Sequence, residues 1–253
     1  MKNKIVFITG ATSGIGEGCA RKFAAMGSDL ILNGRNIEKL NVLKTELTAQ
    51  GADVLTLPFD VRDRSAMRSA VESLNGKWRN IDVLINNAGL VIGVDKEFEG
   101  NLDELDIMLD TNIRGLLSMT RMIVPGMVER GYGHIINIGS IAGDAAYPGG
   151  SVYCATKAAV KALSDGLRID LVDTPLRVTN IKPGMVETNF TVVRYRGDKE
   201  RADDFYKGIH PLNGDDIAEV VYYAASAPAH VQIAEVLVMP TNQATGTINH
   251  KTK

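Results

Sequence analysis

The sequence predicts a doubly wound α/β domain, in which a mostly parallel sheet is covered by helices on both faces. Short runs rich in β-branched residues alternate with longer stretches of helix length along the whole chain. Most of these runs are apolar nearly throughout, which is typical of strands that are buried on both faces. Alternation of this kind implies right-handed crossovers between parallel strands.

Seven runs are expected to form the strands of this sheet. They cover residues 4–9, 29–33, 52–57, 81–87, 133–139, 176–182 and 235–239. The segments between them have the length of helices. In the segment 36–50, apolar residues recur at helical spacing and Gly51 ends the pattern.

One domain is expected over residues 1–253, because a chain of this length with 45% hydrophobic residues can bury one sizeable core. Residues 185–211 depart from the alternating pattern, since they are polar and mixed in character. They follow a predicted strand, and ligands of open α/β sheets bind at the carboxyl ends of strands. We therefore expect this insertion to be a substrate lid.

Composition and charge exclude several classes of partner. The net charge is −2 and the basic residues are scattered, which argues against nucleic acid as a partner. The two cysteines, Cys19 and Cys154, lie in predicted helices, so a reducing compartment is expected. The first apolar run ends at Gly10, too early for a signal peptide, and no run approaches the length of a membrane span. The expected location is the cytoplasm, without a membrane partner, and the dispersed histidines predict no metal site.

A glycine-rich turn, TGATSGIG, follows the first predicted strand and opens the first predicted helix. Glycines at its first, fifth and seventh positions after Thr9 allow a tight turn and close approach of a pyrophosphate to a helix N-terminus. The spacing is G-x-x-x-G-x-G rather than the common G-x-G-x-x-G. A purely structural turn is the alternative, but the position between strand and helix favours a Rossmann-type cofactor site. Its predicted binding residues are Gly10, Thr12, Ser13, Gly14, Ile15 and Gly16.

Arg35 indicates which dinucleotide is bound. A site for NAD would offer a carboxylate to the ribose 2′-hydroxyl at the end of the second strand. This chain has Gly34 and Arg35 there instead, and a guanidinium can hold a 2′-phosphate. The prediction is NADP(H), the alternative being that Arg35 is a solvated residue at a helix start.

Taken together, the motifs resemble those of the short-chain dehydrogenases/reductases over essentially the whole chain. The matching stretches are TGATSGIG, DV, NNAG, TNIRG, INIGS, YCATK and PGMVET. The resemblance implies that Asp60 and Val61 flank the adenine, and that Asn87, Ala88 and Gly89 line the nicotinamide side. It further implies a homotetramer and contacts to the carboxamide from residues 183–188. The residues expected to make the carboxamide contacts are Pro183, Gly184, Val186 and Thr188.

The chemistry expected of such a protein needs an acid that protonates a carbonyl oxygen as hydride arrives. Tyr153 is too weak unaided, because lowering its pKa from about 10 to about 7 requires roughly 4 kcal/mol. Lys157 lies four residues later on the same helix face and can supply positive charge. Ser140, at the end of the fifth strand, would hydrogen-bond the substrate oxygen. By resemblance, Lys157 also holds the ribose, and Asn112 holds a water that relays protons to it.

The substrate is expected to be small and anionic. Within the family, the chain looks closest to NADP-dependent 3-hydroxy acid dehydrogenases, which act on serine, allo-threonine, 3-hydroxyisobutyrate, 3-hydroxypropionate and isethionate or on semialdehydes and sulfoacetaldehyde. Arg194, in the expected lid, is our candidate for binding a carboxylate or sulfonate, with Arg196 as the second candidate. The alternative is that both arginines pair with acidic residues of the lid itself.

Two other functions remain to be weighed. Reduction of a 3-oxoacyl thioester would need a basic surface for an acidic carrier protein, and the slight net acidity argues weakly against it. A non-catalytic NADP-binding sensor or scaffold of the same fold would be expected to lack part of the catalytic set. Asn112, Ser140, Tyr153 and Lys157 are all present, which favours an enzyme.

Overall fold

The computed structural model describes residues 1–252, and its centre is a single sheet of seven strands. The strands are β1 (Ile5–Ile8), β2 (Asp29–Gly34), β3 (Val54–Pro58), β4 (Val83–Asn86), β5 (His134–Ile138), β6 (Arg177–Pro183) and β7 (Glu235–Val238). Their order is β3-β2-β1-β4-β5-β6-β7. Each predicted run overlaps one of these strands, and β2, β3 and β6 extend one residue beyond the predicted run. The sheet, predicted to be mostly parallel, is parallel at every pairing.

Helices fill the connections between strands. They are α1 (Gly14–Ala25), α2 (Ile37–Ala49), α3 (Arg64–Glu72), α4 (Leu102–Leu109), α5 (Leu116–Arg130), α6 (Ser151–Asp170), α7 (Asn189–Arg194), α8 (Lys199–Tyr206) and α9 (Gly214–Ser226). α2 matches the predicted helix 36–50, and Asn36 caps it by accepting a hydrogen bond from the amide of Lys39 at 2.7 Å. None of the helices in residues 1–252 is long and apolar enough to cross a membrane.

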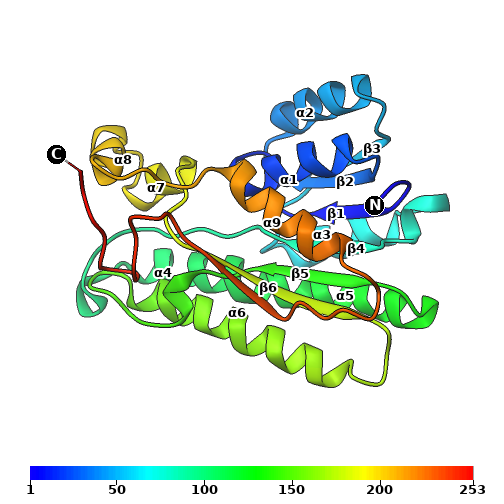
Figure 1. Cartoon of the computed structure of the whole chain (residues 1–253). Coiled ribbons are helices and arrows are strands. Elements are labelled where there is room, and N and C mark those ends of the chain that lie inside the picture. Colours follow the sequence, from blue (N-terminus) through cyan, green and yellow to red (C-terminus); the bar gives the residue numbers. More distant parts are fainter. Residues whose placement is uncertain (253) are drawn as a thin grey trace.

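The helices form two layers, one on each face of the sheet (Figure 1). On one face, α1, α2 and α9 pack against strand residues such as Val6 and Leu32. On the other face, α3, α5 and α6 pack against residues such as Phe7 and Ile135. Adjacent residues of β1 thus point into the cores on opposite faces of the sheet. This is why the strand sequences are apolar at consecutive positions.

The expected lid region lies at the carboxyl ends of the strands and contains α7 and α8 (Figure 1). The two ends of the insertion are joined to each other at its base. Val186 forms a parallel bridge with Leu212, the amide of Leu212 donates to the carbonyl of Met185 at 3.0 Å, and the amide of Glu187 donates to the carbonyl of Leu212 at 2.7 Å. The insertion therefore leaves and rejoins the domain at one point.

Candidate active site

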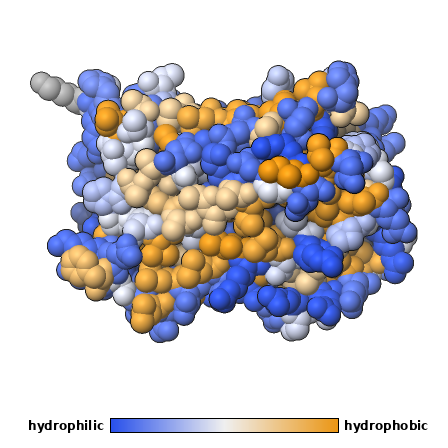
Figure 2. Space-filling view, turned by 90° about the horizontal axis from the view of Figure 1, so that it is seen from below, coloured by the Kyte–Doolittle hydropathy of each residue, from blue (hydrophilic) through white to orange (hydrophobic). Residues whose placement is uncertain are grey.

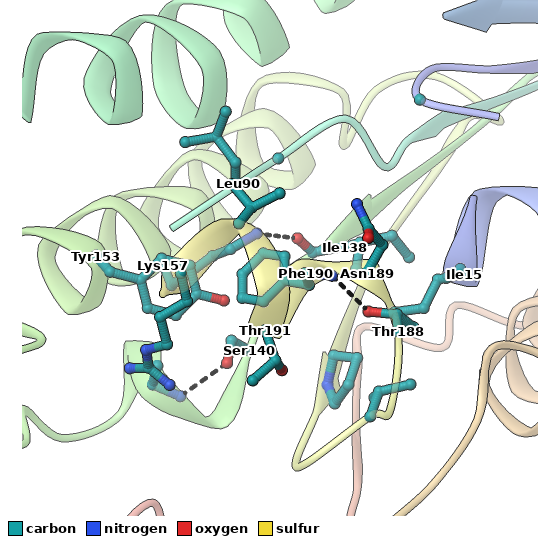
Figure 3. A pocket seen from close by; sticks show the side chains of 18 of the residues that line it. Ile15, Leu90, Ile138, Ser140, Tyr153, Lys157, Thr188, Asn189, Phe190 and Thr191 are labelled. Carbon is teal, nitrogen blue, oxygen red and sulfur yellow. Dashed lines mark hydrogen bonds between the residues drawn. The ribbon is translucent and has the colours of Figure 1, made fainter. Parts of the chain in front are cut away.

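A cavity of about 590 Å³ opens at the carboxyl edge of the sheet, where the strand order reverses between β1 and β4. Ligands of doubly wound sheets bind at this position. Every residue predicted for the site lines this cavity except Gly16 and Asn112. Segments far apart in the chain therefore meet around one space, and the residues labelled in Figure 3 come from five of them.

The glycine-rich turn forms one wall of this cavity and has the geometry that a pyrophosphate requires. Gly10 and Gly14 adopt positive φ angles of 65° and 55°. A side chain at Gly16 would lie only 2.3 Å from the carbonyl oxygen of Gly10, so Gly16 acts from behind the turn. Asn87 ties the turn to β4 by donating to the carbonyls of Thr9 and Gly10 at 2.9 and 3.0 Å.

The N-terminus of α1 points its first amides toward this wall. The side chain of Ser13, at the N-cap, makes no capping hydrogen bond to the described part of the chain. Amides at a helix start that lack an acceptor, together with the helix dipole, favour an anion. The cradle formed by the glycines and the start of α1 therefore fits a dinucleotide phosphate.

Arg35 lines the cavity beyond this cradle, at the end of β2. Its side chain is 68% exposed, and its Nη1 is 3.9 Å from a carboxylate oxygen of Asp60. Asp60 itself is held by Arg62, whose Nε donates to Oδ1 at 3.1 Å and whose Nη2 donates to Oδ2 at 2.7 Å. Burial acts to raise the pKa of the Asp60 carboxyl, but the hydrogen bonds from Arg62 outweigh burial and hold this pKa below its usual range. Arg35 is thus only loosely paired and remains available for a phosphate.

Tyr153 and Lys157 lie on the same face of α6 and are both buried, at 8% and 6% exposure. Lys157 Nζ donates to the carbonyl oxygen of Ile138, at the end of β5, at 2.8 Å (Figure 3). It lies 5.9 Å from the centre of the Tyr153 ring. Burial lowers the pKa of Lys157 to about 8.

The protein's own groups raise the pKa of Tyr153, whereas its pairing with Lys157 predicts a lowered pKa. Burial, and next the neighbouring Tyr147, raise the pKa of Tyr153 well above its usual value. The Ser140 hydroxyl and the charge of Arg194 act in the opposite direction but are weaker. The physical reason is that Tyr153 is desolvated, whereas the ammonium of Lys157 is directed at a backbone carbonyl. At neutral pH these surroundings keep Tyr153 protonated.

Ser140 follows β5 and faces the cavity beside Tyr153 (Figure 3). Its Oγ accepts a hydrogen bond from the amide of Ala142 at 3.1 Å. Because that contact uses the hydroxyl as an acceptor, the hydroxyl proton is left to donate to a ligand.

Asn112 lies in a π-helical turn, Asp110–Gly115, between α4 and α5. Wide turns of this kind are frequent at functional sites. Its amide donates to the carbonyl of Leu90 and the hydroxyl of Thr156, and its Oδ1 accepts from the amide of Leu90 at 2.9 Å. A Cβ at Gly89 would lie 3.3 Å from this oxygen and 3.5 Å from Lys157 Nζ, so the glycine leaves the space between them open.

The two arginines of the lid have different surroundings. Arg194 lines the cavity, its Nη2 donates to the hydroxyl of Tyr147, and its guanidinium lies 5.1 Å from the centre of the Tyr147 ring. Arg194 Nε is buried and has no hydrogen-bond partner among residues 1–252. Arg196 instead forms ion pairs with Asp95 and Glu104. The alternative in which both arginines pair with acids of the lid is therefore wrong for both.

Sequence reasoning missed two parts of the cavity wall. The first consists of aromatic residues, Tyr147 together with members of the lid, and the second consists of residues near the C-terminus. These additional lining residues are Phe190, Tyr195, Phe205, Tyr206, Gln243, Gly246, Thr247 and Asn249. The aromatic spacing within the lid was a usable signal. The C-terminal residues carry no local pattern that points to a site. Within residues 1–252, no cluster of three or more His, Cys, Asp or Glu side chains is placed to hold a metal.

Comparisons with known proteins agree with this geometry. Residues 4–198 match the family model for short chain dehydrogenase. The NADP-dependent 3-hydroxy acid dehydrogenase YdfG of Salmonella typhi is 49% identical, and the alignment covers 94% of this chain and 96% of that protein. Sulfoacetaldehyde reductase 2 of Chromohalobacter salexigens is 45% identical, with 95% of each chain covered. The closed form of a serine dehydrogenase complexed with NADP+ is 44% identical, has a TM-score of 0.93, and aligns with 98% of this chain and 100% of its own.

Proposed function

Because this chain belongs to the short-chain dehydrogenase family, we propose that it is an NADP(H)-dependent oxidoreductase acting on small 3-hydroxy acids or similar anionic alcohols. The reaction interconverts the hydroxyl compound and its carbonyl form, including semialdehydes and sulfoacetaldehyde. The single observation that carries the substrate class is Arg194, a partly buried arginine without an ion pair within residues 1–252, which lines the same cavity as Tyr153 and Ser140. Relatives named for these reactions support the proposal.

The cofactor is held by the glycine-rich turn, the start of α1 and Arg35. The turn supplies backbone amides for the pyrophosphate, and the loosely paired Arg35 binds the 2′-phosphate. Asp60 and Val61 line the adenine end, while Asn87, Ala88 and Gly89 line the other end. The segment after β6 completes this end with Pro183, Gly184, Val186 and Thr188. When bound, the nicotinamide donates or accepts the hydride, and its oxidised ring adds a positive charge near Tyr153.

Tyr153 is the proton donor to the substrate oxygen in the reductive direction. Its raised pKa keeps the phenol protonated at neutral pH, which suits a group that must deliver a proton. Ser140 donates its hydroxyl proton to the same oxygen and stabilises the negative charge that develops there. Lys157 keeps two further N–H groups besides the one bonded to Ile138, and these bind the ribose hydroxyls and stabilise the phenolate.

Asn112 holds a water through which Tyr153 is reprotonated after it has given its proton to the substrate. Its amide hydrogens are engaged by Leu90 and Thr156, so the free lone pair of Oδ1 is the group left to hold a water. The open space at Gly89 lies between this oxygen and Lys157. Protons would reach the lysine by this route.

Arg194 binds the carboxylate or sulfonate of the substrate. Tyr147 accepts a hydrogen bond from one guanidinium nitrogen, and the rings of Tyr147 and Phe205 flank the charge at 5.1 and 5.8 Å. The remaining N–H groups are oriented for a planar anion. A neutral thioester would leave this partly buried charge without an anionic partner, which argues against the 3-oxoacyl thioester reductase. The intact catalytic set argues against a sensor or scaffold.

We further propose that the protein works as a homotetramer in the cytoplasm. The face formed by α4, α5 and α6 carries a broad apolar band (Figure 2). Exposed apolar side chains on these helices and on the turn after α6 include Leu102, Leu117, Val128, Ile169 and Val172. On β7, the last strand of the sheet, Leu237 is also exposed. The apolar band on α4, α5 and α6 supports an assembly through this face, and the exposed Leu237 on a different element is compatible with a second interface.

A steady-state comparison tests the proposed function. Serine, 3-hydroxyisobutyrate, sulfoacetaldehyde and an acetoacetyl thioester are assayed with NADP(H) and NAD(H) in the appropriate directions. The expected result is that an anionic short-chain compound has the highest kcat/KM and that NADP(H) is preferred. A higher kcat/KM for the thioester would overturn the proposal.

A further inference from the structure

Arg196 joins the lid to the opposite side of the cavity mouth. It lies in the turn between α7 and α8, while its partners belong to another part of the chain, Asp95 in the segment after β4 and Glu104 on α4. Arg196 Nε donates to Glu104 Oε1 at 2.9 Å, and Nη2 donates to Glu104 Oε2 at 2.7 Å and also to Asp95. One guanidinium thus binds two acidic residues, with a bidentate contact to one of them.

A backbone contact strengthens the same junction. The amide of Gly93 donates to the carbonyl of Arg194 at 2.9 Å. Gly93 has a φ of +78°, and a Cβ there would lie 2.8 Å from Arg196 Nη2. The next residue, Val94, lines the cavity. Residues 93–95 and 194–196 are therefore closely packed at the edge of the site. The ion pairs of Arg196 lie next to the hydrogen bond between Gly93 and Arg194.

The backbone of Arg196 is held in the turn that ends α7. Its φ is +54°, in the left-handed region that residues other than glycine seldom adopt. Such a conformation persists where surrounding contacts over-determine it. Here those contacts are the hydrogen bonds that end α7, from the amide of Arg196 to the carbonyl of Val193 at 3.0 Å and from the amide of Gly197 to the carbonyl of Val192 at 2.9 Å. The Arg196 side chain reaches its two carboxylates from this fixed turn.

We infer that Arg196 is a positioning residue for the anion site, an inference that rests on the proposed function. Arg194 is the last residue of α7 and stands two positions before Arg196. The ion pairs of Arg196 hold the end of α7 against residues 93–95, and this keeps the Arg194 side chain directed into the cavity. Arg196 itself does not touch the cavity and is 44% exposed, so it acts through Arg194 rather than on substrate.

The test compares four variants. Arg196→Asn removes the ion pairs and keeps a residue that tolerates positive φ. Glu104→Gln removes the bidentate partner from the other side. Arg196→Lys keeps the charge and serves as the conservative rescue. Lys199→Gln, the matched control, removes one positive charge from an exposed lid position.

Two readouts separate positioning from general damage. The first is kcat and KM for 3-hydroxyisobutyrate and for propan-2-ol, an uncharged alcohol, with NADP+. The second is hydrogen exchange of the backbone amides in residues 189–206, followed by mass spectrometry. In Arg196→Asn and Glu104→Gln, KM for the acid should rise about tenfold with kcat nearly unchanged, as for residues of one interacting network. KM for the alcohol should not change, exchange in residues 189–206 should be faster, and Arg196→Lys should recover most of both losses.

Three results would overturn the inference. They are equal changes of KM for the acid and the alcohol, unchanged exchange in Arg196→Asn, and the same kinetic effect in Lys199→Gln. Failure of the proposed function is a different result, because the wild-type protein would then not oxidise the acid with NADP+ at all. In that case the positioning role falls with it, whereas a normal wild type with unaffected variants rejects the positioning role alone.

Discussion

Lys157 Nζ lies 2.8 Å from the carbonyl oxygen of Ile138 and 5.9 Å from the centre of the Tyr153 ring. The ammonium is therefore fixed by the end of β5 and not by the tyrosine. This arrangement leaves the pKa of Tyr153 raised, and it presents the lysine to both the phenol and the cofactor side of the cavity.

Tyr153→Phe should abolish turnover and leave NADPH binding nearly intact, because it removes only the proton donor. A positioned acid contributes about 10²–10⁴-fold, so the fall in kcat should lie in or above this range. Lys157→Ala is the contrasting variant, and it should weaken both turnover and NADPH binding. The measurements are kcat for reduction and NADPH affinity from fluorescence titration. Substantial activity in Tyr153→Phe would show that another group delivers the proton.

Arg35→Ala should weaken NADPH binding and leave NADH binding unchanged. The guanidinium lies 3.9 Å from a carboxylate oxygen of Asp60, which is a weak ion pair, and it has no closer ion pair within residues 1–252. The substitution therefore removes little from the protein without cofactor. A hydrogen bond to a charged group contributes about 1.5–3 kcal/mol, so the dissociation constant for NADPH should rise about 10–100-fold. Calorimetric titration of both cofactors measures this directly. Equal weakening of both would mean that Arg35 supports the fold of the site rather than the 2′-phosphate.

Arg194→Ala should raise KM for 3-hydroxy acids and spare an uncharged alcohol. The partly buried guanidinium has the Tyr147 hydroxyl as a partner but no ion pair within residues 1–252, so its loss removes the charge proposed to bind the substrate anion. The expected increase in KM is about 10–100-fold, from the same strength of a charged hydrogen bond. Steady-state kinetics on the acid and on propan-2-ol provide the comparison. Parallel losses on both substrates would argue for a structural role.

His134 should make the protein less stable as the pH falls below neutrality. Its Nε2 lies 2.7 Å from Thr179 Oγ1, which itself donates to Ile233, so Nε2 carries the proton and the ring is neutral. Burial, and next the charge of Arg177, lower the pKa of His134 to about 3. The unfolded chain takes up a proton near pH 6.5 while the folded chain does not, and stability is therefore lost as pH falls from about 6.5 toward 3.

The matched variant is His134→Gln, whose amide nitrogen can still donate to Thr179. Between pH 6.5 and pH 5 the wild type should lose up to about 2 kcal/mol more of its free energy of unfolding than the variant. Urea denaturation at fixed protein concentration measures both. Identical pH profiles would show that another group dominates acid destabilisation.

Much of the fold was predictable because its signals are local. Continuous apolar runs identified each strand, and the glycines of the first turn are required by positive φ angles and close contacts that any side chain would block. Tyr153 and Lys157 share a helix face, so their proximity to each other was predictable from their spacing alone. The partners of Arg196 did not follow, since Asp95 and Glu104 lie about a hundred residues earlier in the chain and depend on how the lid folds back. The raised pKa of Tyr153 depends on burial, which no motif encodes.

The parallel bridge between Val186 and Leu212 holds the two ends of the lid side by side. A segment attached in this way can be exchanged, lengthened or shortened without changing the register of β6 or the start of α9. Substrate choice can then change with the lid, provided that Thr188, the lid residue assigned to cofactor binding, is retained. A lid transplanted from a relative and joined at these two residues should transfer the substrate preference of that relative, while Ser140, Tyr153 and Lys157 stay in place.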